Sequence, residues 1–258
     1  MDRRNFLLKS AGLLISSYFG LNSFSKALAI EKHRNHPFNQ PFIALIIDDI
    51  GHNLSHARQF LKLGVPITFS ILPRLVYSYD LAVEIHDKGH EIMLHQPMEP
   101  YNADSFDPGP GALYVGDGSD RIGRVIEENI AGVPYAVGAN NHMGSRFTEC
   151  RKEIREALKV VKKKGLFFVD SRTSSHSVGY KTARKLHMAA TGSNIFLDNF
   201  HEESFIYYQL HKLKKHAKRY GHAVGIGHPF PKTVRAIGRF YKDLKDSDIS
   251  LVYVSEVL

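Results

Sequence analysis

Two adjacent aspartates, Asp48 and Asp49, directly follow an apolar run over residues 42–47. Neighbouring residues that leave a strand point to opposite sides unless the chain turns sharply, and Gly51 permits such a turn. One carboxylate could then bind a divalent cation while the other stays free as a general base. In the alternative interpretation, one aspartate caps a helix and the other is merely solvated. We expect the first arrangement.

Two histidines, His95 and His142, are predicted to end two further strands. With a carboxylate between them, they would form a His/His/Asp site that leaves coordination positions open for water. This ligand set is typical of catalytic zinc. The sequence therefore predicts a divalent-metal site, with zinc as the favoured metal.

A third histidine, His228, leaves a later predicted strand at the rigid turn over residues 225–229. Asp170 ends another predicted strand, and barrel geometry would bring the two side chains together. A carboxylate bonded to an imidazole fixes its tautomer and raises its pKa, as a general acid near neutral pH requires. We expect Asp170 and His228 to form such a pair.

The elements that must position these residues alternate between short apolar runs and longer amphipathic ones, which predicts repeated βα units around a parallel sheet. The predicted strands cover residues 42–47, 67–71, 91–95, 135–139, 166–169, 195–197, 223–226 and 249–254. The predicted helices cover residues 54–63, 79–88, 119–130, 149–164, 177–186, 202–220 and 232–244. The irregular segment 96–118 carries four prolines, and a loop of that length is usually functional.

The polar residues singled out for chemistry all follow or end predicted strands: Asp48, Asp49, His95, Asn140, Asn141, His142, Asp170, Asp198 and His228. In a parallel βα barrel the carboxyl ends of the strands meet on one face, where active sites lie. An open doubly wound sheet would also bind ligands at this edge. The chain length of 258 residues and its 43% hydrophobic content fit one large α/β domain over residues 42–258.

The N-terminus is typical of an export signal. A basic pair, an apolar run over residues 11–24 and the small-residue pattern 27–29 predict cleavage before Ile30. The motif over residues 3–9 resembles the twin-arginine signal, with an ordinary secretory signal or an uncleaved anchor as alternatives. Residues 1–29 are thus predicted to be removed, residues 30–41 to form a flexible lead-in, and the mature protein to be periplasmic without a stable membrane span.

The formal net charge is +8, of which residues 1–29 contribute +3 (four basic residues against one acidic), leaving about +5. This excess lies mainly on predicted helices over residues 159–164 and 212–219, where a solvated face explains it. We expect no nucleic-acid partner, since no zinc-finger or RNA-binding motif is present. The single cysteine, Cys150, excludes an internal disulfide.

From residue 42 onward the chain resembles the divergent polysaccharide deacetylase family, a branch of the NodB-like deacetylases. The resemblance rests on segments 46–51 (IIDDIG), 89–100 (GHEIMLHQPMEP), 108–113 (PGPGAL), 138–148 (GANNHMGSRFT), 167–174 (FFVDSRTS), 196–199 (FLDN) and 225–229 (GIGHP). It implies a single distorted (β/α) barrel of about seven parallel strands.

The family's first motif implies that Asp48 is the general base and Asp49 a metal ligand. Its second motif is a His-x-x-x-His pair, of which His95 matches the first member, but Glu99 occupies the second position. The third ligand is therefore either Glu99 or His142. His142 is favoured because two prolines flank Glu99 closely and oppose a helical turn between positions 95 and 99.

The later motifs imply that Asp170 and His228 supply an aspartate and a histidine acid, and Arg146 would orient the base or the substrate. The activity so implied is metal-dependent removal of N-acetyl groups from an acetylated cell-envelope glycan. Hydrolysis of an O-acetyl ester or another amide, and carbohydrate binding without turnover, are the alternatives.

Overall fold

A computed structural model describes residues 40–245 and 247–258. The predicted export signal over residues 1–29 lies outside the described residues, as do residues 30–39 of the predicted lead-in. The strands are β1 (Phe42–Ile50), β2 (Thr68–Ile71), β3 (Glu91–Met98), β4 (Gly138–Met143), β5 (Phe167–Asp170), β6 (Ala190–Gly192), β7 (Ile195–Phe196), β8 (His222–Gly227) and β9 (Ser250–Val252).

Every strand pairing in the sheet is parallel, and the strand order is β6-β5-β4-β3-β2-β1-β8-β7, with β9 pairing to the first residues of β1. The last strands at the two ends of this path, β6 and β7, are joined in sequence by only Ser193 and Asn194. The Ser193 N–H donates to Asp170 O (2.9 Å) and the Asn194 N–H donates to Val224 O (2.8 Å). The sheet is thereby curled into a half-barrel, which confirms the predicted α/β fold class.

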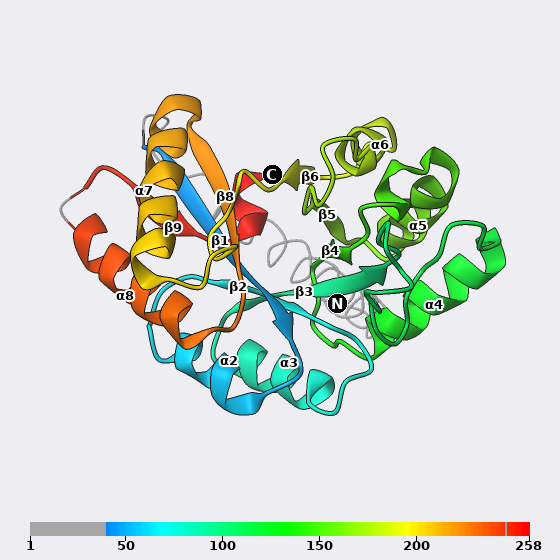
Figure 1. The fold of residues 1–258 in the computed structure, drawn as a ribbon, viewed down its shortest axis with the longest axis horizontal. Coiled ribbons are helices and arrows are strands. Elements are labelled where there is room, and N and C mark those ends of the chain that lie inside the picture. Colours follow the sequence, from blue (N-terminus) through cyan, green and yellow to red (C-terminus); the bar gives the residue numbers. More distant parts are fainter. Residues whose placement is uncertain (1–39, 246) are drawn as a thin grey trace, which may run out of the picture. The chain divides into compact units, whose positions relative to one another are not determined.

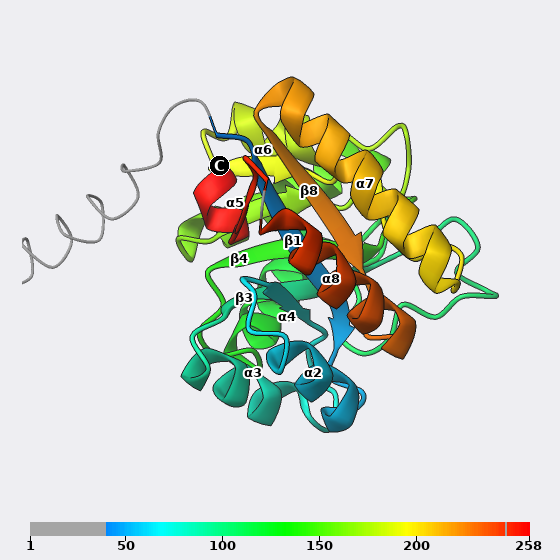
Figure 2. The same cartoon turned by 90° about the vertical axis from the view of Figure 1, so that its left-hand side faces the viewer.

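Helices surround the outer face of the curled sheet, as Figures 1 and 2 show. They are α2 (Leu54–Leu61), α3 (Ser78–Asp87), α4 (Ser119–Ala131), α5 (Arg151–Lys163), α6 (Gly179–Lys185), α7 (Glu203–Tyr220) and α8 (Pro231–Leu244), with 3-10 helices η1 (Phe147–Glu149) and η2 (Val254–Val257). Their starts and ends differ from the sequence predictions by at most two residues. None of the helices in the described part of the chain is long and apolar enough to span a bilayer.

The buried side chains form two hydrophobic clusters, one on the outer face of the sheet and one on its inner face. Ile43, Leu45 and Ile47 of β1 pack outward in the cluster that also contains helical side chains. Ala44 and Ile46 face inward, in a smaller cluster with residues such as Met93, Phe167, Val169, Val224 and Ile226. Strand residues alternate between the two faces. A polar side chain therefore enters the barrel when it lies an even number of residues from an inward-facing neighbour on the same strand.

Gly138, the first residue of β4, packs directly against the ring of Phe167. A Cβ atom at this position would lie 2.2 Å from the ring of Phe167 on the neighbouring strand. No side chain fits there unless Phe167 moves, so glycine allows the aromatic ring to fill the interior below the site.

The two strand predictions that were wrong concern β4 and β6. A strand was expected over residues 135–139, but β4 covers Gly138–Met143 because Tyr135 adopts a φ of 65° in a turn. Strand β6 was not predicted, since three residues are too few to show an alternating pattern. The shift of β4 matters most, because it places Asn140 and His142 within a strand rather than after one.

Candidate metal centre

Asp48 and Asp49 both reach the inner side of the barrel, although consecutive strand residues normally face opposite sides. Asp48 shares the inward parity of Ile46 and is 2% exposed. Asp49 has a φ of 57°, a left-handed conformation that turns its side chain away from the outward direction. The register between β1 and β2 also shifts between Ile47 and Ile50. The sharp turn expected at Gly51 therefore begins at Asp49 itself.

Asp49, His95 and His142 form a three-residue cluster whose ligand-type atoms lie within 4.8 Å of one another. Asp49 Oδ1 lies 3.2 Å from His95 Nε2 and 2.9 Å from His142 Nδ1. The two imidazole nitrogens are themselves 3.2 Å apart. Strands β1, β3 and β4 thus bring the three predicted ligands to one point.

The donor set fits a divalent metal. Asp49 Oδ1 is buried, yet neither imidazole is aligned to donate a hydrogen bond to it. Zinc binds carboxylate oxygen and imidazole nitrogen at about 2.0–2.2 Å in a tetrahedral arrangement, which separates ligand atoms by about 3.4 Å. The observed separations of 2.9–3.2 Å require only a small adjustment. Two ring nitrogens that converge on a buried carboxylate oxygen without a hydrogen bond to it are the expected arrangement for metal ligands.

Glu99, the alternative third ligand, binds elsewhere. Its Oε1 accepts a hydrogen bond from Arg146 Nη1 (2.6 Å), and its Oε2 accepts one from the Val115 N–H (2.6 Å). Arg146 was expected to orient the base or the substrate, but its ion-pair partner in the described part of the chain is Glu99 rather than Asp48. The Glu99–Arg146 pair instead joins the loop after β3 to the turn after β4.

The surroundings of Asp48 and Asp49 shift the pKa values of the two carboxyl groups in opposite directions. Burial raises the pKa of Asp48, which lies 3.6 Å from His95 Nε2 through its Oδ2. Burial also acts to raise the pKa of Asp49, but the adjacent imidazoles of His142 and His95 outweigh it and hold that pKa well below its usual range. The two neighbours therefore differ in proton affinity in the direction that a base and a ligand require.

His228 reaches the same site from the end of β8, with its Nε2 atom 3.9 Å from Asp49 Oδ2. Its other ring nitrogen, Nδ1, lies 2.8 Å from Asp198 Oδ1, and its backbone N–H donates to Asp198 Oδ2 (2.6 Å). Burial acts to lower the pKa of His228, but the Asp198 carboxylate outweighs it and raises the pKa to about 9. The imidazole–carboxylate pair exists, but its carboxylate is Asp198.

The predicted contact between Asp170 and His228 is wrong. Asp170 has the outward parity of Phe168, and its carboxylate accepts hydrogen bonds from the Arg172 N–H, Ser177 Oγ and the Tyr180 N–H. It therefore ties the end of β5 to the first turn of α6. The alternation of β5 carries the signal that could have excluded Asp170, because its inward neighbour Val169 belongs to the inner cluster.

Asn140 was singled out as a polar residue near a predicted strand end, but the sequence assigned it no specific role. It is completely buried on the inner face of β4 and contacts both Asp48 and His95. Its inward position could be inferred only with the correct limits of β4, since Asn140 and His142 then share one face.

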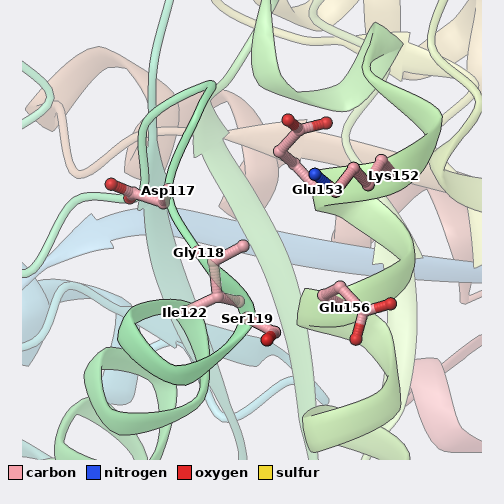
Figure 3. A pocket seen from close by; sticks show the side chains of 7 residues that line it. All are labelled: Asp117, Gly118, Ser119, Ile122, Lys152, Glu153 and Glu156. Carbon is pink, nitrogen blue, oxygen red and sulfur yellow. The ribbon is translucent and has the colours of Figure 1, made fainter.

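A pocket of about 190 Å³ opens beside the cluster. Its lining residues are Asp49, Ile50, Gly51, His52, Asn53, His56, His228, Pro229 and Phe230. A larger concavity of about 400 Å³ lies elsewhere, where the start of α4 faces α5 (Figure 3). Carboxylates and Lys152 both line that second concavity, and none of its residues belongs to the cluster. Of these two hollows in the described part of the chain, the smaller one adjoins the cluster and could admit a reacting group.

Residues 45–258 match the family described as divergent polysaccharide deacetylase. The chain is 32% identical over 216 residues to the uncharacterized protein YibQ of Escherichia coli strain K12. The matched region covers 84% of this chain and 67% of YibQ.

Among solved structures, the protein ATU2773 from Agrobacterium tumefaciens C58 superposes with a TM-score of 0.81 at 22% identity, covering 85% of this chain and 90% of that chain. The family 4 carbohydrate esterase from Streptomyces lividans, in complex with acetate, superposes with a TM-score of 0.53 at 15% identity. The superposition covers 84% of this chain and 94% of the esterase. BA3943 from Bacillus anthracis, a CE4 family pseudoenzyme, superposes with a TM-score of 0.51 at 17% identity. The superposition covers 86% of this chain and 66% of BA3943. These structures share the fold, and the family match over residues 45–258 shows that the chain belongs to the divergent polysaccharide deacetylases.

Proposed function

We propose that this protein is an exported, zinc-dependent deacetylase that removes N-acetyl groups from a cell-envelope glycan. Family membership supports a deacetylase-like hydrolase with a carbohydrate substrate. The observation that carries the finer proposal is the convergence of Asp49, His95 and His142 beside a buried carboxylate, Asp48, and an imidazole, His228.

Asp49, His95 and His142 would hold the metal through Oδ1, Nε2 and Nδ1. Two imidazoles and one carboxylate are a ligand set of catalytic zinc sites, and zinc is the metal proposed here. Bound there, the metal would supply a Lewis acid for the acyl carbonyl and for the attacking water.

Asp48 is placed to act as the general base. Its Oδ1 is held by Asn140 Nδ2 (2.9 Å), while its Oδ2 faces the cluster. We propose that Asp48 accepts the proton of the water whose oxygen forms the new bond to the acyl carbon. Burial raises its pKa and so strengthens it as a base for a reaction near neutral pH.

His228 is placed to act as the general acid. Its Nδ1 is fixed by Asp198, which leaves Nε2 directed toward Asp49 and the adjoining pocket. As the C–N bond breaks, Nε2 would protonate the departing nitrogen, so that acetate and a free amino sugar result. Asp198 replaces Asp170 as the residue that positions this acid.

Asp48→Asn tests the assignment of the base. We expect zinc affinity to remain near the wild-type value, while acetate release from chitooligosaccharides or peptidoglycan fragments falls at least about 100-fold. Metal content and acetate would be measured on the same purified mature protein. Unchanged acetate release in the variant would contradict the role of Asp48.

The same assay separates the other functions that this geometry permits. Release of acetate from O-acetylated but not N-acetylated glycans would identify an esterase. Zinc binding without acetate release from either substrate would indicate a binding protein, a function consistent with a fold that also occurs in the pseudoenzyme from Bacillus anthracis.

Export to the periplasm is proposed from the sequence of residues 1–29 alone. If it is correct, the protein recovered from a periplasmic fraction begins at Ile30 by mass spectrometry. A full-length chain in the membrane fraction would instead favour an uncleaved anchor.

A further inference from the structure

Asn140 uses its whole side-chain amide to connect the ends of four other chain segments. Its Oδ1 atom lies 2.8 Å from His95 Nδ1 on β3 and 2.5 Å from Ser70 Oγ on β2. Its Nδ2 atom donates to Asp48 Oδ1 on β1 (2.9 Å) and to Ser171 Oγ, just after β5 (3.2 Å). Because the residue is completely buried, water does not compete for these four bonds.

The orientation of the amide follows from Asp48. An ionised carboxylate only accepts hydrogen bonds, so the NH₂ group of Asn140 must face Asp48. The reverse orientation would place Asn140 Oδ1 against a carboxylate oxygen at 2.9 Å, with no proton between them. The amide oxygen is therefore directed to His95 and Ser70.

The amide orientation in turn dictates the proton position on His95. Asn140 Oδ1 has no proton to give, so His95 Nδ1 must carry the hydrogen in their 2.8 Å contact. In the neutral ring, Nε2 is then unprotonated and presents its lone pair to the point shared with Asp49 Oδ1 and His142 Nδ1.

We propose that Asn140 is a positioning residue that couples the metal ligand His95 to the base Asp48. Through one amide it holds His95 in the Nδ1–H tautomer and fixes the carboxylate of Asp48 beside it. The coupling to the base rests on the proposed function. The tautomer of His95 does not, because it follows from the orientation of the Asn140 amide and not from any deacetylase activity.

Three variants separate the parts of this proposal. Asn140→Leu removes both the acceptor for His95 and the donor to Asp48 at similar side-chain volume. Asn140→Asp keeps an oxygen acceptor for His95 but places a carboxylate against Asp48. Ser70→Ala is the matched control, since it removes a buried hydrogen bond to the same Oδ1 atom, and the Ser70 hydroxyl forms no hydrogen bond with His95 or Asp48 within the described residues.

The first readout is the proton position on His95, followed by ¹H–¹⁵N long-range NMR of the metal-free protein at the alkaline end of its titration. We expect the Nδ1–H form in wild type, Ser70→Ala and Asn140→Asp, and a mixture of tautomers in Asn140→Leu. The second readout is zinc affinity by chelator competition, which we expect to fall about 10- to 100-fold in Asn140→Leu alone.

A folded Asn140→Leu protein with the wild-type tautomer and wild-type zinc affinity would overturn the proposal. If that variant does not fold, Asn140→Asp decides, because a His95 ring that moves its proton to Nε2 there would also overturn it. The coupling to the base predicts that Asn140→Asp loses at least about 10-fold in acetate release despite normal zinc binding. Should wild type release no acetate, the proposed function fails, while the NMR and zinc measurements still decide the role of Asn140.

Discussion

Asp49 creates the site by departing from the alternation of its own strand. With a φ of 57°, it joins Asp48 on the inner side, where a regular strand would present only one of the two carboxylates. A non-glycine residue in the left-handed region costs free energy, and such residues gather at functional sites. Met143, the last residue of β4, and Arg172, two residues after the end of β5, also have positive φ angles. Local strain thus accompanies the carboxyl ends of the strands that surround the cluster.

At the level of single residues, the choice of third ligand gives a direct prediction. We expect His142→Ala to lower zinc affinity at least about 100-fold, more than the loss of a supporting residue would. Glu99→Gln should bind zinc close to the wild-type value, because Glu99 is engaged with Arg146 and the Val115 N–H. Chelator competition measures both constants. A large loss of affinity in Glu99→Gln with little effect in His142→Ala would reverse the assignment.

At the level of elements, the strands carry the catalytic candidates at their carboxyl ends and structural hydrogen bonds at their amino ends. At the carboxyl end, β4 presents Asn140 and His142 on one face. At the amino end, Glu91 of β3 accepts hydrogen bonds from Thr68 Oγ1 (2.8 Å) and from the Ser255 N–H of η2. The Val254 N–H also donates to Thr68 Oγ1 (3.1 Å), so η2 is held against the starts of β2 and β3.

The buried hydrogen bonds of Glu91 predict that the stability of the folded state depends on pH. Burial raises the pKa of Glu91, so the folded state binds its proton more tightly than the unfolded chain does. Stability from the wild-type residue is then greatest below the unfolded pKa of about 4.3 and falls as pH rises through the folded pKa. Glu91→Gln keeps an oxygen acceptor without the charge. We expect it to melt a few degrees higher than wild type at pH 8 and to lose this advantage at pH 4.

Thermal unfolding of both proteins at the two pH values measures this difference. A constant difference in melting temperature would mean that Glu91 does not titrate between the folded and unfolded states as described.

At the level of the whole molecule, the half-barrel has two different ends. The C-terminal segment lies at the amino end of the strands, where Val254 is fully buried in the inner cluster. The candidate centre lies at the carboxyl end, beside the pocket lined by His228 and Phe230. A metal there would link β1, β3 and β4, and so would stabilise the folded state as a whole.

Zinc is therefore expected to raise the melting temperature. At a free concentration of about 100 times Kd, binding adds about 2.7 kcal/mol to the unfolding free energy. For a domain of this size that corresponds to a rise of roughly 5–10 °C. The shift should be largely lost in His142→Ala and retained in His222→Ala, which changes an exposed histidine at the start of β8. Equal shifts in the two variants would show that zinc acts at another site.

The sequence by itself determined the fold class and most of the candidate residues, because both depend on local patterns. Apolar runs alternating with amphipathic ones are enough to predict a parallel α/β sheet, and polar residues at strand ends must gather on one edge. Asp48, Asp49, His95, His142 and His228 were all found in this way, and the structure brings them together.

Only the tertiary structure decided which of these side chains touch. The register and curvature of the sheet place Asp198 rather than Asp170 against His228, and they place His142 rather than Glu99 in the cluster. The inward turn of Asp49 and the four bonds of Asn140 likewise depend on several strands at once. Sequence patterns report what each strand prefers along its own length, whereas these contacts arise between strands far apart in the chain.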